Sequence, residues 1–400
     1  MTDTSTGKGW LVPIFALFVA TFVIGTAELI VMGLLPALAA DIGVDIPTAG
    51  LLITGYAVGV AIASPVLVLV TGGMQRKLLL VIVMSVFVLG NALCAIATGY
   101  WMLVGARLLV ACSQGVFFGI AMGIAMRLAP EGRQTTALSF LVAGNTPSQI
   151  LGVPIGTATG TDFGWRATFW TVAAASAVAA LVIWVLVPRA GDEGAAKSDL
   201  RAEIAAATRP VVLLCFGMII LFMTGVFAFF SYLVPLLTTV SGVPTAYVPW
   251  VLFGMGFVGF FGNLAGGRLG DWKPMATMVG ILATFAVLLV ILSQVTAIMW
   301  VTVTLLLLLW LTGFGFVAPV QARILKAASD APNFASTLIS SAFNIGIAGG
   351  AALGGAVIAA GWGYGTLPLV GAAAQCGAFG LLLTLAFVER RIRPTAAVPA

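Results

Sequence analysis

Long apolar stretches separated by short polar ones make up almost the whole chain. A transmembrane helix needs about 20 mostly apolar residues, and twelve stretches reach that length. They predict spans near 11–35, 49–70, 78–98, 101–126, 135–160, 167–187, 211–237, 247–268, 275–294, 298–322, 334–358 and 365–388. The first stretch is longer than a signal-peptide core and has no small-residue cleavage site, so it counts as a mature span. The pattern predicts an all-α membrane protein.

The longest polar stretch, residues 188–210, divides the twelve predicted spans into two sets of six. The two sets share glycine motifs: Gly72-Gly73 recurs as Gly266-Gly267, and Gly152, Gly156 and Gly160 recur as Gly346, Gly350 and Gly354. Both motifs repeat at an offset of 194 residues, which indicates an internal duplication. The sequence therefore predicts an N-terminal six-helix bundle (1–187), a cytoplasmic linker (188–210) and a C-terminal six-helix bundle (211–400).

Composition excludes several classes of protein. Hydrophobic residues make up 61% of the chain and charged residues only 8%, against about a quarter charged in soluble domains. Histidine is absent, which leaves carboxylates as the expected proton carriers. The four cysteines lie in apolar runs without metal-ligand spacing. With no phosphate-binding loop, we expect no metal, cofactor or direct use of ATP, and a proton gradient as the driving force.

The basic residues predict the orientation of the chain. With the amino terminus inside, 16 of the 18 lysines and arginines fall in inner loops and tails. Arg107 lies within a span, and Arg166 alone falls in an outer loop. The positive-inside rule then places both termini in the cytoplasm. The net charge of +5 reflects this asymmetry, so we expect a cell-membrane protein with no nucleic-acid partner, acting as a monomer on a small molecule.

Two charges are predicted to lie at membrane depth. Glu28 closes the segment Gly25-Thr26-Ala27-Glu28, roughly 10–12 Å below a membrane face if the span ends at Pro36 and a loop follows over 36–48. Arg107 lies roughly 9 Å from its own helix end. Charged residues inside a membrane are costly and are functional by default. They are therefore candidates for proton coupling, although a fixed ion pair between them remains the structural alternative.

Polar amides and aromatic residues are candidates for a substrate cavity. Amides in hydrocarbon need a partner or a wet cavity, which favours the following: Gln114, Asn145, Gln149 and Asn344. Five aromatic candidates carry a stronger alternative, packing or lipid contact: Tyr56, Phe229, Tyr232, Trp310 and Phe314. In the fifth span Pro154 predicts a kink. Gly152 and Gly156 permit a close helix contact, either fixed or hinge-like.

Several motifs together carry a resemblance to a known family. They are Gly25-Thr26-Ala27-Glu28, Gly33-Leu34-Leu35-Pro36, Pro47-Thr48-Ala49-Gly50-Leu51-Leu52, Gly152-Val153-Pro154-Ile155-Gly156-Thr157 and Gly164-Trp165-Arg166-Ala167-Thr168-Phe169. With two six-span halves, the chain resembles the major facilitator superfamily over nearly its whole length. Within that family it is similar to the drug–proton antiporter branch, close to arabinose-efflux and chloramphenicol-efflux permeases.

This resemblance implies roles for particular residues. Arg107 matches the arginine of the family's span-four motif, associated with proton coupling, and Gly152, Pro154 and Gly156 match its span-five antiporter motif. A cytoplasmic gate is implied at the family's loop motif and its second-half copy: Gly73, Arg76, Lys77, Arg268 and Asp271. The first copy has no acid where the family usually has one, whereas the second keeps Asp271.

The sequence favours proton-driven export of a small, fairly hydrophobic compound, such as chloramphenicol, another drug, a sugar or a nucleoside. The expected mechanism is alternating access with a shared proton and substrate site near the membrane midplane. A proton-coupled uptake symporter of the same fold stays open. So does a protein of another class, a non-transporting sensor or a lipid-modifying enzyme, although no nucleophile–base set supports an enzyme.

Overall fold

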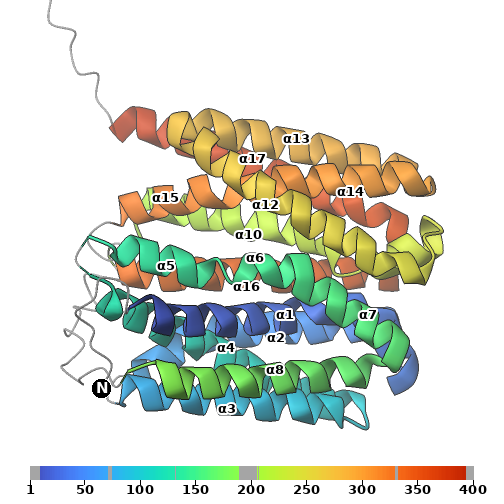
Figure 1. Cartoon of the computed structure of the whole chain (residues 1–400). Helices are drawn as coiled ribbons and strands as arrows, with labels where there is room; N and C mark the ends of the chain where they lie inside the picture. The colour runs from blue at the N-terminus through green and yellow to red at the C-terminus, as the bar shows by residue number, and fades with distance from the viewer. Residues whose placement is uncertain are drawn as a thin grey trace, which may run out of the picture. The chain divides into compact units, whose positions relative to one another are not determined.

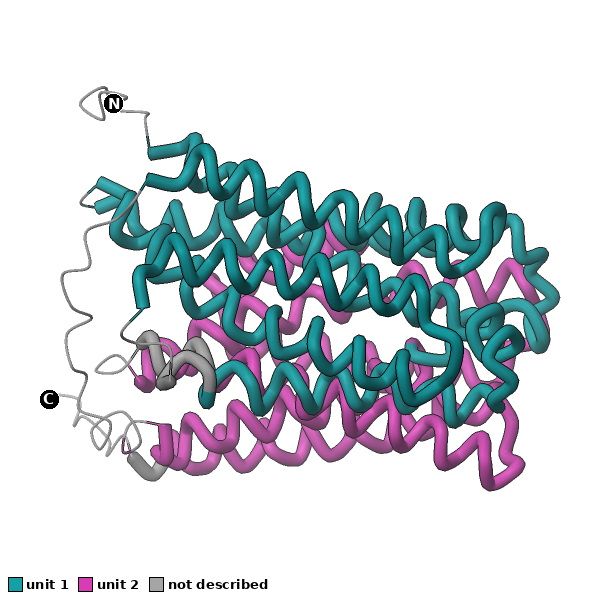
Figure 2. The backbone as a smooth tube through the Cα atoms, turned by 90° about the horizontal axis from the view of Figure 1, so that it is seen from below, with its two compact units in different colours: residues 1–196, 231–257 teal, residues 197–230, 258–400 magenta. Residues whose placement is uncertain are grey.

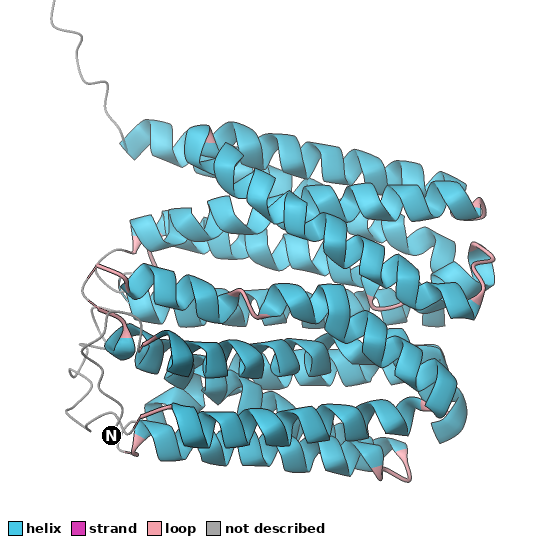
Figure 3. Cartoon of the chain, viewed as in Figure 1, coloured by secondary structure: helices cyan, strands magenta, loops and turns pink. Residues whose placement is uncertain are grey.

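The computed structural model of the chain describes residues 10–70, 74–130, 132–188, 205, 207–328 and 332–392 (Figure 1). Within these ranges the backbone is helical apart from short turns, and no strand occurs in them (Figure 3). The predicted linker 188–210 lies almost entirely outside the described residues, as do Gly72 and Gly73.

The first of two compact units comprises Met1–Ala196 and Ser231–Phe257 (Figure 2). Its elements are α1 (Leu11–Ile42), α2 (Ile46–Val70), α3 (Arg76–Ala95), α4 (Tyr100–Leu128), α5 (Gln134–Val142), α6 (Asn145–Pro147), η1 (Ser148–Gly152), α7 (Val153–Phe163), α8 (Trp165–Leu186), α11 (Leu233–Pro235), η2 (Leu236–Val240) and η3 (Thr245–Tyr247). Helix α12 (Val248–Trp272) begins in this unit and ends in the other. Residues 231–257 thus cluster with the first unit, and the predicted bundle boundaries stay a prediction.

The second unit comprises Lys197–Phe230 and Val258–Ala400. Besides the end of α12 it holds α10 (Pro210–Phe230), α13 (Pro274–Val295), α14 (Met299–Gly313), η4 (Phe314–Phe316), α15 (Val317–Ala327), α16 (Pro332–Ala359), η5 (Tyr364–Thr366) and α17 (Leu367–Ile392). Helix α10 packs against both α16 and α17. Its sequence is apolar on every side, as expected of a helix that is surrounded by other helices and lipid.

Eleven helices in the described ranges are long and apolar enough to span a membrane. The remaining predicted span, the fifth in chain order (residues 135–160), corresponds to four shorter pieces, α5, α6, η1 and α7. The segment is interrupted by a turn at Ala143 and Gly144 and by a five-residue π-helical turn at Ser148–Gly152, which ends two residues before Pro154 in α7. Proline lacks an N–H and crowds the carbonyl four residues earlier. The π-helical turn therefore breaks the regular α-helical pattern just before Pro154, where the sequence predicts a kink, and the kink itself stays a prediction.

The predicted loop 36–48 is wrong at both ends, because residues 36–42 belong to α1 and residues 46–48 to α2. Helix α1 continues through Pro36 to Ile42, and only residues 43–45 separate it from α2. Gly43 ends α1 in the left-handed conformation (φ 73°), and its N–H donates to the carbonyl of Ala39. A single proline does not end this helix because packing of α1 inside the unit sustains it. Glu28 therefore lies deeper, about 21 Å from the end of α1.

Glycines bring the pieces of the fifth span against α1. A Cβ added at Gly25 would collide with Asn145 and Ser148, and one at Gly152 would collide with Thr26. Further along, Gly156 faces Ile30 in the same way. The predicted close approach of a neighbouring helix is confirmed, and that neighbour is α1. Whether the contact also moves during a functional cycle stays a prediction.

Candidate functional site

Three helices of the first unit bring polar side chains together around Glu28. Glu28 lies on α1, Tyr56 on α2, and Arg107 and Gln114 on α4. Arg107 and Gln114 are seven residues apart, two helical turns, so they share one face of α4. Arg107, Tyr56 and Gln114 are each at most 2% exposed, whereas Glu28 is half-buried. A hydrogen-bonded polar cluster thus occupies the interior of an apolar unit.

The Glu28 carboxylate is held by an amide. Gln114 Nε2 donates to Glu28 Oε2 at 2.9 Å, and the Tyr56 hydroxyl donates to Gln114 Oε1 at 2.5 Å. These two bonds form a chain from α2 through α4 to α1. Since buried polar groups need partners, the chain also explains how three helices tolerate polar side chains at this depth.

Arg107 contacts the backbone of α1 rather than the carboxylate. Its Nη1 donates to the carbonyl of Ala27 at 2.9 Å, and Nη2 to the carbonyl of Glu28 at 3.5 Å. Its guanidinium also stacks on the ring of Tyr56, 3.9 Å from the ring centre. No ion pair within the described ranges joins Arg107 to the Glu28 carboxylate, so the alternative of a fixed side-chain pair does not describe this arrangement. The guanidinium is thus bonded to the backbone of α1, and the side-chain donor on the Glu28 carboxylate is Gln114.

The predicted amides do not all join this cluster. Asn145 lies against Gly25, one helical turn from Glu28, and is half-buried. Gln149 lies in the π-helical turn η1 and is also half-buried. Asn344 is in the second unit, where its amide nitrogen donates to the carbonyl of Ser340 on its own helix at 3.0 Å. The structure therefore brings Gln114 to Glu28 directly and Asn145 to its neighbourhood.

The aromatic candidates separate into different environments. Tyr56 belongs to the Glu28 cluster. Tyr232 is fully buried in the first unit, where its ring lies against Gly50. Trp310 packs with Phe229 and Phe314 in the second unit, with ring centres 6.2 and 6.5 Å apart. These two ring contacts are packing, which the sequence offered as the stronger alternative for aromatic residues.

The structure describes four of the five predicted gate residues. Arg76 begins α3, and the Lys77 ammonium lies 5.4 Å from the ring centre of Trp184 on α8. Arg268 and Asp271 are both exposed near the end of α12. Gly73 is outside the described residues. The gating role of these residues remains a prediction.

Two features were missed in the sequence. The carbonyls of Ala27 and Glu28 serve as acceptors for Arg107, and no side-chain pattern reveals a backbone acceptor. Gln375 on α17 is fully buried, and its amide nitrogen donates to the carbonyl of Phe222 at 3.0 Å. A lone amide within a predicted span was the available signal for Gln375, the same signal that singled out Asn344.

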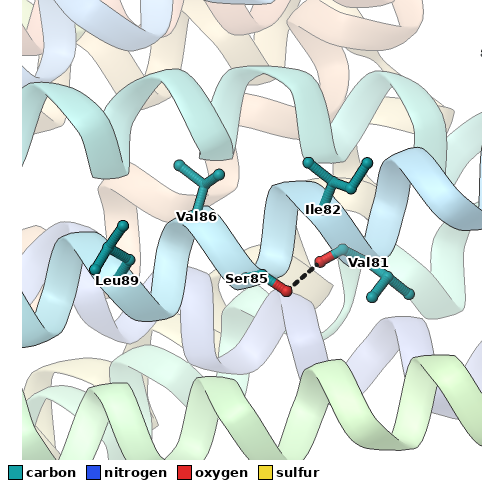
Figure 4. Close-up of a pocket in the computed structure, with 5 residues that line it drawn as sticks. All are labelled: Val81, Ile82, Ser85, Val86 and Leu89. Carbon is teal, nitrogen blue, oxygen red and sulfur yellow. Dashed lines mark hydrogen bonds between the residues drawn. The ribbon is translucent and has the colours of Figure 1, made fainter.

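One surface hollow is unrelated to this chemistry. Val81, Ile82, Ser85, Val86 and Leu89 line it, all from α3 (Figure 4). The Ser85 hydroxyl, its only polar side chain, donates to the carbonyl of Val81 at 2.8 Å. A hollow lined by one helix and without charge suits contact with lipid and offers no site for proton coupling.

Comparison with known proteins places these observations in a family. The model of the Major Facilitator Superfamily matches residues 17–351. The chain is similar to the inner membrane transport protein YdhP of Escherichia coli K12, with 34% identity over 393 residues covering 96% of this chain and 97% of YdhP. It is also similar to the probable sugar efflux transporter of Helicobacter pylori 26695, with 30% identity covering 99% and 100%. The putative transporter AraJ of E. coli K12 is 30% identical, covering 94% and 96%.

A solved structure supports the fold. A bacterial homolog of the human lysosomal transporter Spinster, in an inward-facing and unoccupied conformation, superposes with a TM-score of 0.75. The match covers 98% of this chain and 100% of the homolog at 12% sequence identity, so it shows the fold alone. Together with the family match, it confirms the predicted all-α membrane fold.

Proposed function

Since the chain belongs to the Major Facilitator Superfamily of membrane transporters, we propose that it is a proton-coupled exporter of a small, fairly hydrophobic compound. The substrate classes we propose are sugars, nucleosides and drugs such as chloramphenicol. Export is favoured over uptake because a relative that covers nearly the whole chain is named a probable sugar efflux transporter. We further propose a monomer in the cell membrane with both termini in the cytoplasm, as the distribution of basic residues predicts.

The single observation that carries the proposal is the position of Glu28. It is an acid within an apolar helix, half-buried, with an amide donor on its carboxylate and an arginine on the neighbouring carbonyls. A carboxylate bound by one neutral donor can exchange a proton more readily than one locked in an ion pair. This arrangement suits a group that must gain and lose a proton in each transport cycle.

In the proposed cycle, protons move inward down their gradient while the substrate moves outward. Glu28 takes a proton from the outer, more acidic side and this displaces the substrate; the protein then opens inward and Glu28 releases the proton. Arg107 keeps the ionised form accessible through its charge, while its own hydrogen bonds to α1 persist in both protonation states because they involve backbone carbonyls. Gly152, Pro154 and Gly156 supply the close helix contact that the movement requires, and Arg268 and Asp271 form part of a cytoplasmic gate.

The test is proton movement coupled to substrate. Inverted membrane vesicles, from a host lacking its own efflux pumps, are acidified by respiration and followed with a pH-sensitive dye. Addition of chloramphenicol, arabinose or uridine to the wild-type protein is expected to release protons for at least one of them. Glu28→Gln is expected to abolish that release.

A matched control distinguishes the charge from general disturbance of α1. Thr21→Val lies on the same helix, is fully buried, and removes a hydroxyl that bonds only to the carbonyl of Leu17. It is expected to retain proton release. Substrate-dependent release in a well-folded Glu28→Gln protein would remove Glu28 from the mechanism, and substrate accumulation by intact cells would reverse the proposed direction.

A further inference from the structure

We propose that Tyr56 is a positioning residue, which fixes the orientation of the Gln114 amide and thereby sets how tightly Glu28 holds its proton. This inference rests on the proposed role of Glu28 as the proton carrier. It gives α2 a part in proton coupling. A list of the residues that contact Glu28 would miss this part, since the Tyr56 hydroxyl is linked to the carboxylate only through Gln114.

Chemistry dictates the orientation of the amide when Glu28 is ionised. A carboxylate only accepts hydrogen bonds, so the amide nitrogen of Gln114 must face it. The amide oxygen then faces Tyr56, and the phenol hydroxyl must donate to it. The two bonds, 2.9 Å and 2.5 Å, have this polarity. The orientation therefore follows from the groups themselves as well as from the coordinates.

Tyr56 holds the amide in that orientation because burial removes other partners. Tyr56 and Gln114 are each 2% exposed, so an amide oxygen that lost the hydroxyl would lack water to replace it. Without the hydroxyl, the amide is free to turn its oxygen toward Glu28. An oxygen facing Glu28 accepts a bond only from the protonated acid, so the turned amide favours protonated Glu28.

The other charged and titratable groups near Glu28 are left in place by the test. From α4, Arg107 donates to the carbonyls of Ala27 and Glu28. From α3, the buried thiol of Cys94 is a further titratable group near Arg107. Tyr56→Phe keeps the ring on which the Arg107 guanidinium stacks and removes the hydroxyl alone. On the remaining elements packed against α1, Asp162 of α7 and Arg166 of α8 lie at the helix ends, and Arg166 pairs with Asp41.

The experiment is an infrared titration of the full-length protein in lipid vesicles, which needs no substrate. The infrared absorption of protonated carboxyl groups is followed against pH. The part of this absorption that is missing in Glu28→Gln is assigned to Glu28. Tyr56→Phe is expected to move the midpoint of that part upward by about one pH unit, the scale of one hydrogen bond to a charged group. Gln114→Met is expected to move it upward by at least as much.

The double variant tests the order of action. If Tyr56 acts through Gln114, Tyr56→Phe combined with Gln114→Met has the midpoint of Gln114→Met alone. Two controls on α4, the helix that carries Gln114, should leave the midpoint unchanged. Tyr100→Phe removes a hydroxyl bonded to the carbonyl of Thr48, and Ser113→Ala removes one bonded to the carbonyl of Leu109.

The outcomes separate this inference from the proposed function. Two outcomes overturn the positioning role and leave the role of Glu28 as proton carrier intact. In one, Glu28 titrates but its midpoint in Tyr56→Phe equals that of the wild type; in the other, the midpoint of the double variant shifts further than that of Gln114→Met. A carboxyl band that is identical in wild type and Glu28→Gln at every pH removes the proton role itself. Should Tyr56→Phe fail to fold, an unshifted midpoint in Gln114→Met overturns the inference equally.

Discussion

Positions related by the 194-residue offset carry chemically different side chains in the two units. Glu28 on α1 and Phe222 on α10 are 194 residues apart, the offset that relates the glycine motifs. In the first unit this position carries a carboxylate bonded to Gln114. In the second, Phe222 is buried with its ring 4.4 Å from Phe316 and 5.3 Å from Phe285, centre to centre. One scaffold position serves a polar cluster in one unit and an aromatic core in the other.

The backbone at this position is used alike in both units. The carbonyl of Glu28 accepts a bond from Arg107, and the carbonyl of Phe222 accepts one from Gln375. A buried side-chain donor thus reaches the central helix of each unit at the same turn. The difference lies in the charge, because arginine is permanently charged and glutamine is neutral. The comparison supports the proposal that proton chemistry belongs to the first unit, because the equivalent position of the second unit is part of an aromatic core.

The largest effect is expected from moving the acid to the other unit. Phe222→Glu places a carboxyl among the aromatic rings of Phe285 and Phe316. Burial of an unpaired carboxyl costs about 3 kcal/mol or more, so we expect loss of folded protein. Phe222→Leu, the control, should cost about 1 kcal/mol and remain folded. Thermal unfolding in detergent measures both, and a stable Phe222→Glu protein would show that the second unit accommodates an acid as the first does.

A smaller loss is expected when the charge is kept and its geometry is changed. Arg107→Lys retains the charge, but an ammonium cannot donate to two successive carbonyls while stacking flat on Tyr56. We expect a loss of stability of about 1.5–3 kcal/mol and transport reduced by about tenfold. Arg127→Lys, at the exposed end of the same helix, is the control. Equal behaviour of the two variants would mean that charge alone matters at position 107.

Much of this fold was predictable from the hydrophobic pattern. All twelve apolar runs correspond to helical segments, because length and hydropathy are enough to specify a spanning helix. The depth of Glu28 was underestimated because Pro36 is a strong helix-ending signal in water, and α1 continues past it within the packed unit. Local propensity could not reveal that tertiary override.

The site was predictable in its members but not in its bonds. Glu28, Arg107 and Gln114 were candidates because each is a polar group at membrane depth, and Tyr56 was a candidate as an aromatic residue. Their pairing depends on which helices adjoin and on how each rotates about its axis, and neither follows from one sequence. The expected partners, Glu28 and Arg107, were therefore paired by charge, whereas the structure pairs the acid with Gln114 and the arginine with carbonyls.

The glycine contacts sharpen the comparison between units. Gly156 faces Ile30, and its counterpart Gly350 faces Thr224. The glycine and the residue that it faces are thus both 194 positions further along the chain in the second unit. A Cβ at Gly156 would meet the flexible end of the Ile30 side chain, whereas one at Gly350 would lie 2.6 Å from the backbone oxygen of Thr224.

Backbone cannot move aside as a side-chain end can. We expect Gly350→Ala to destabilise the protein by about 1–3 kcal/mol more than Gly156→Ala. Thermal unfolding of the two variants side by side measures this difference. Equal unfolding temperatures would indicate that helix α16 shifts as a body to relieve the contact, and the two interfaces would then be equally tolerant.

The smallest effect is expected at Gln375, which donates to the carbonyl of Phe222 as Arg107 donates to that of Glu28, although α17 is not the helix related to α4 by the 194-residue offset. Its amide nitrogen donates to the carbonyl of Phe222, while its amide oxygen is buried without a partner within the described ranges. Gln375→Met loses one hydrogen bond but also removes an unsatisfied buried oxygen, and the two effects oppose each other. We expect a change in stability within about 1 kcal/mol and unchanged proton release. A large loss of proton release in Gln375→Met would contradict the assignment of proton chemistry to the first unit, because it would give the second unit a polar group as important as Arg107.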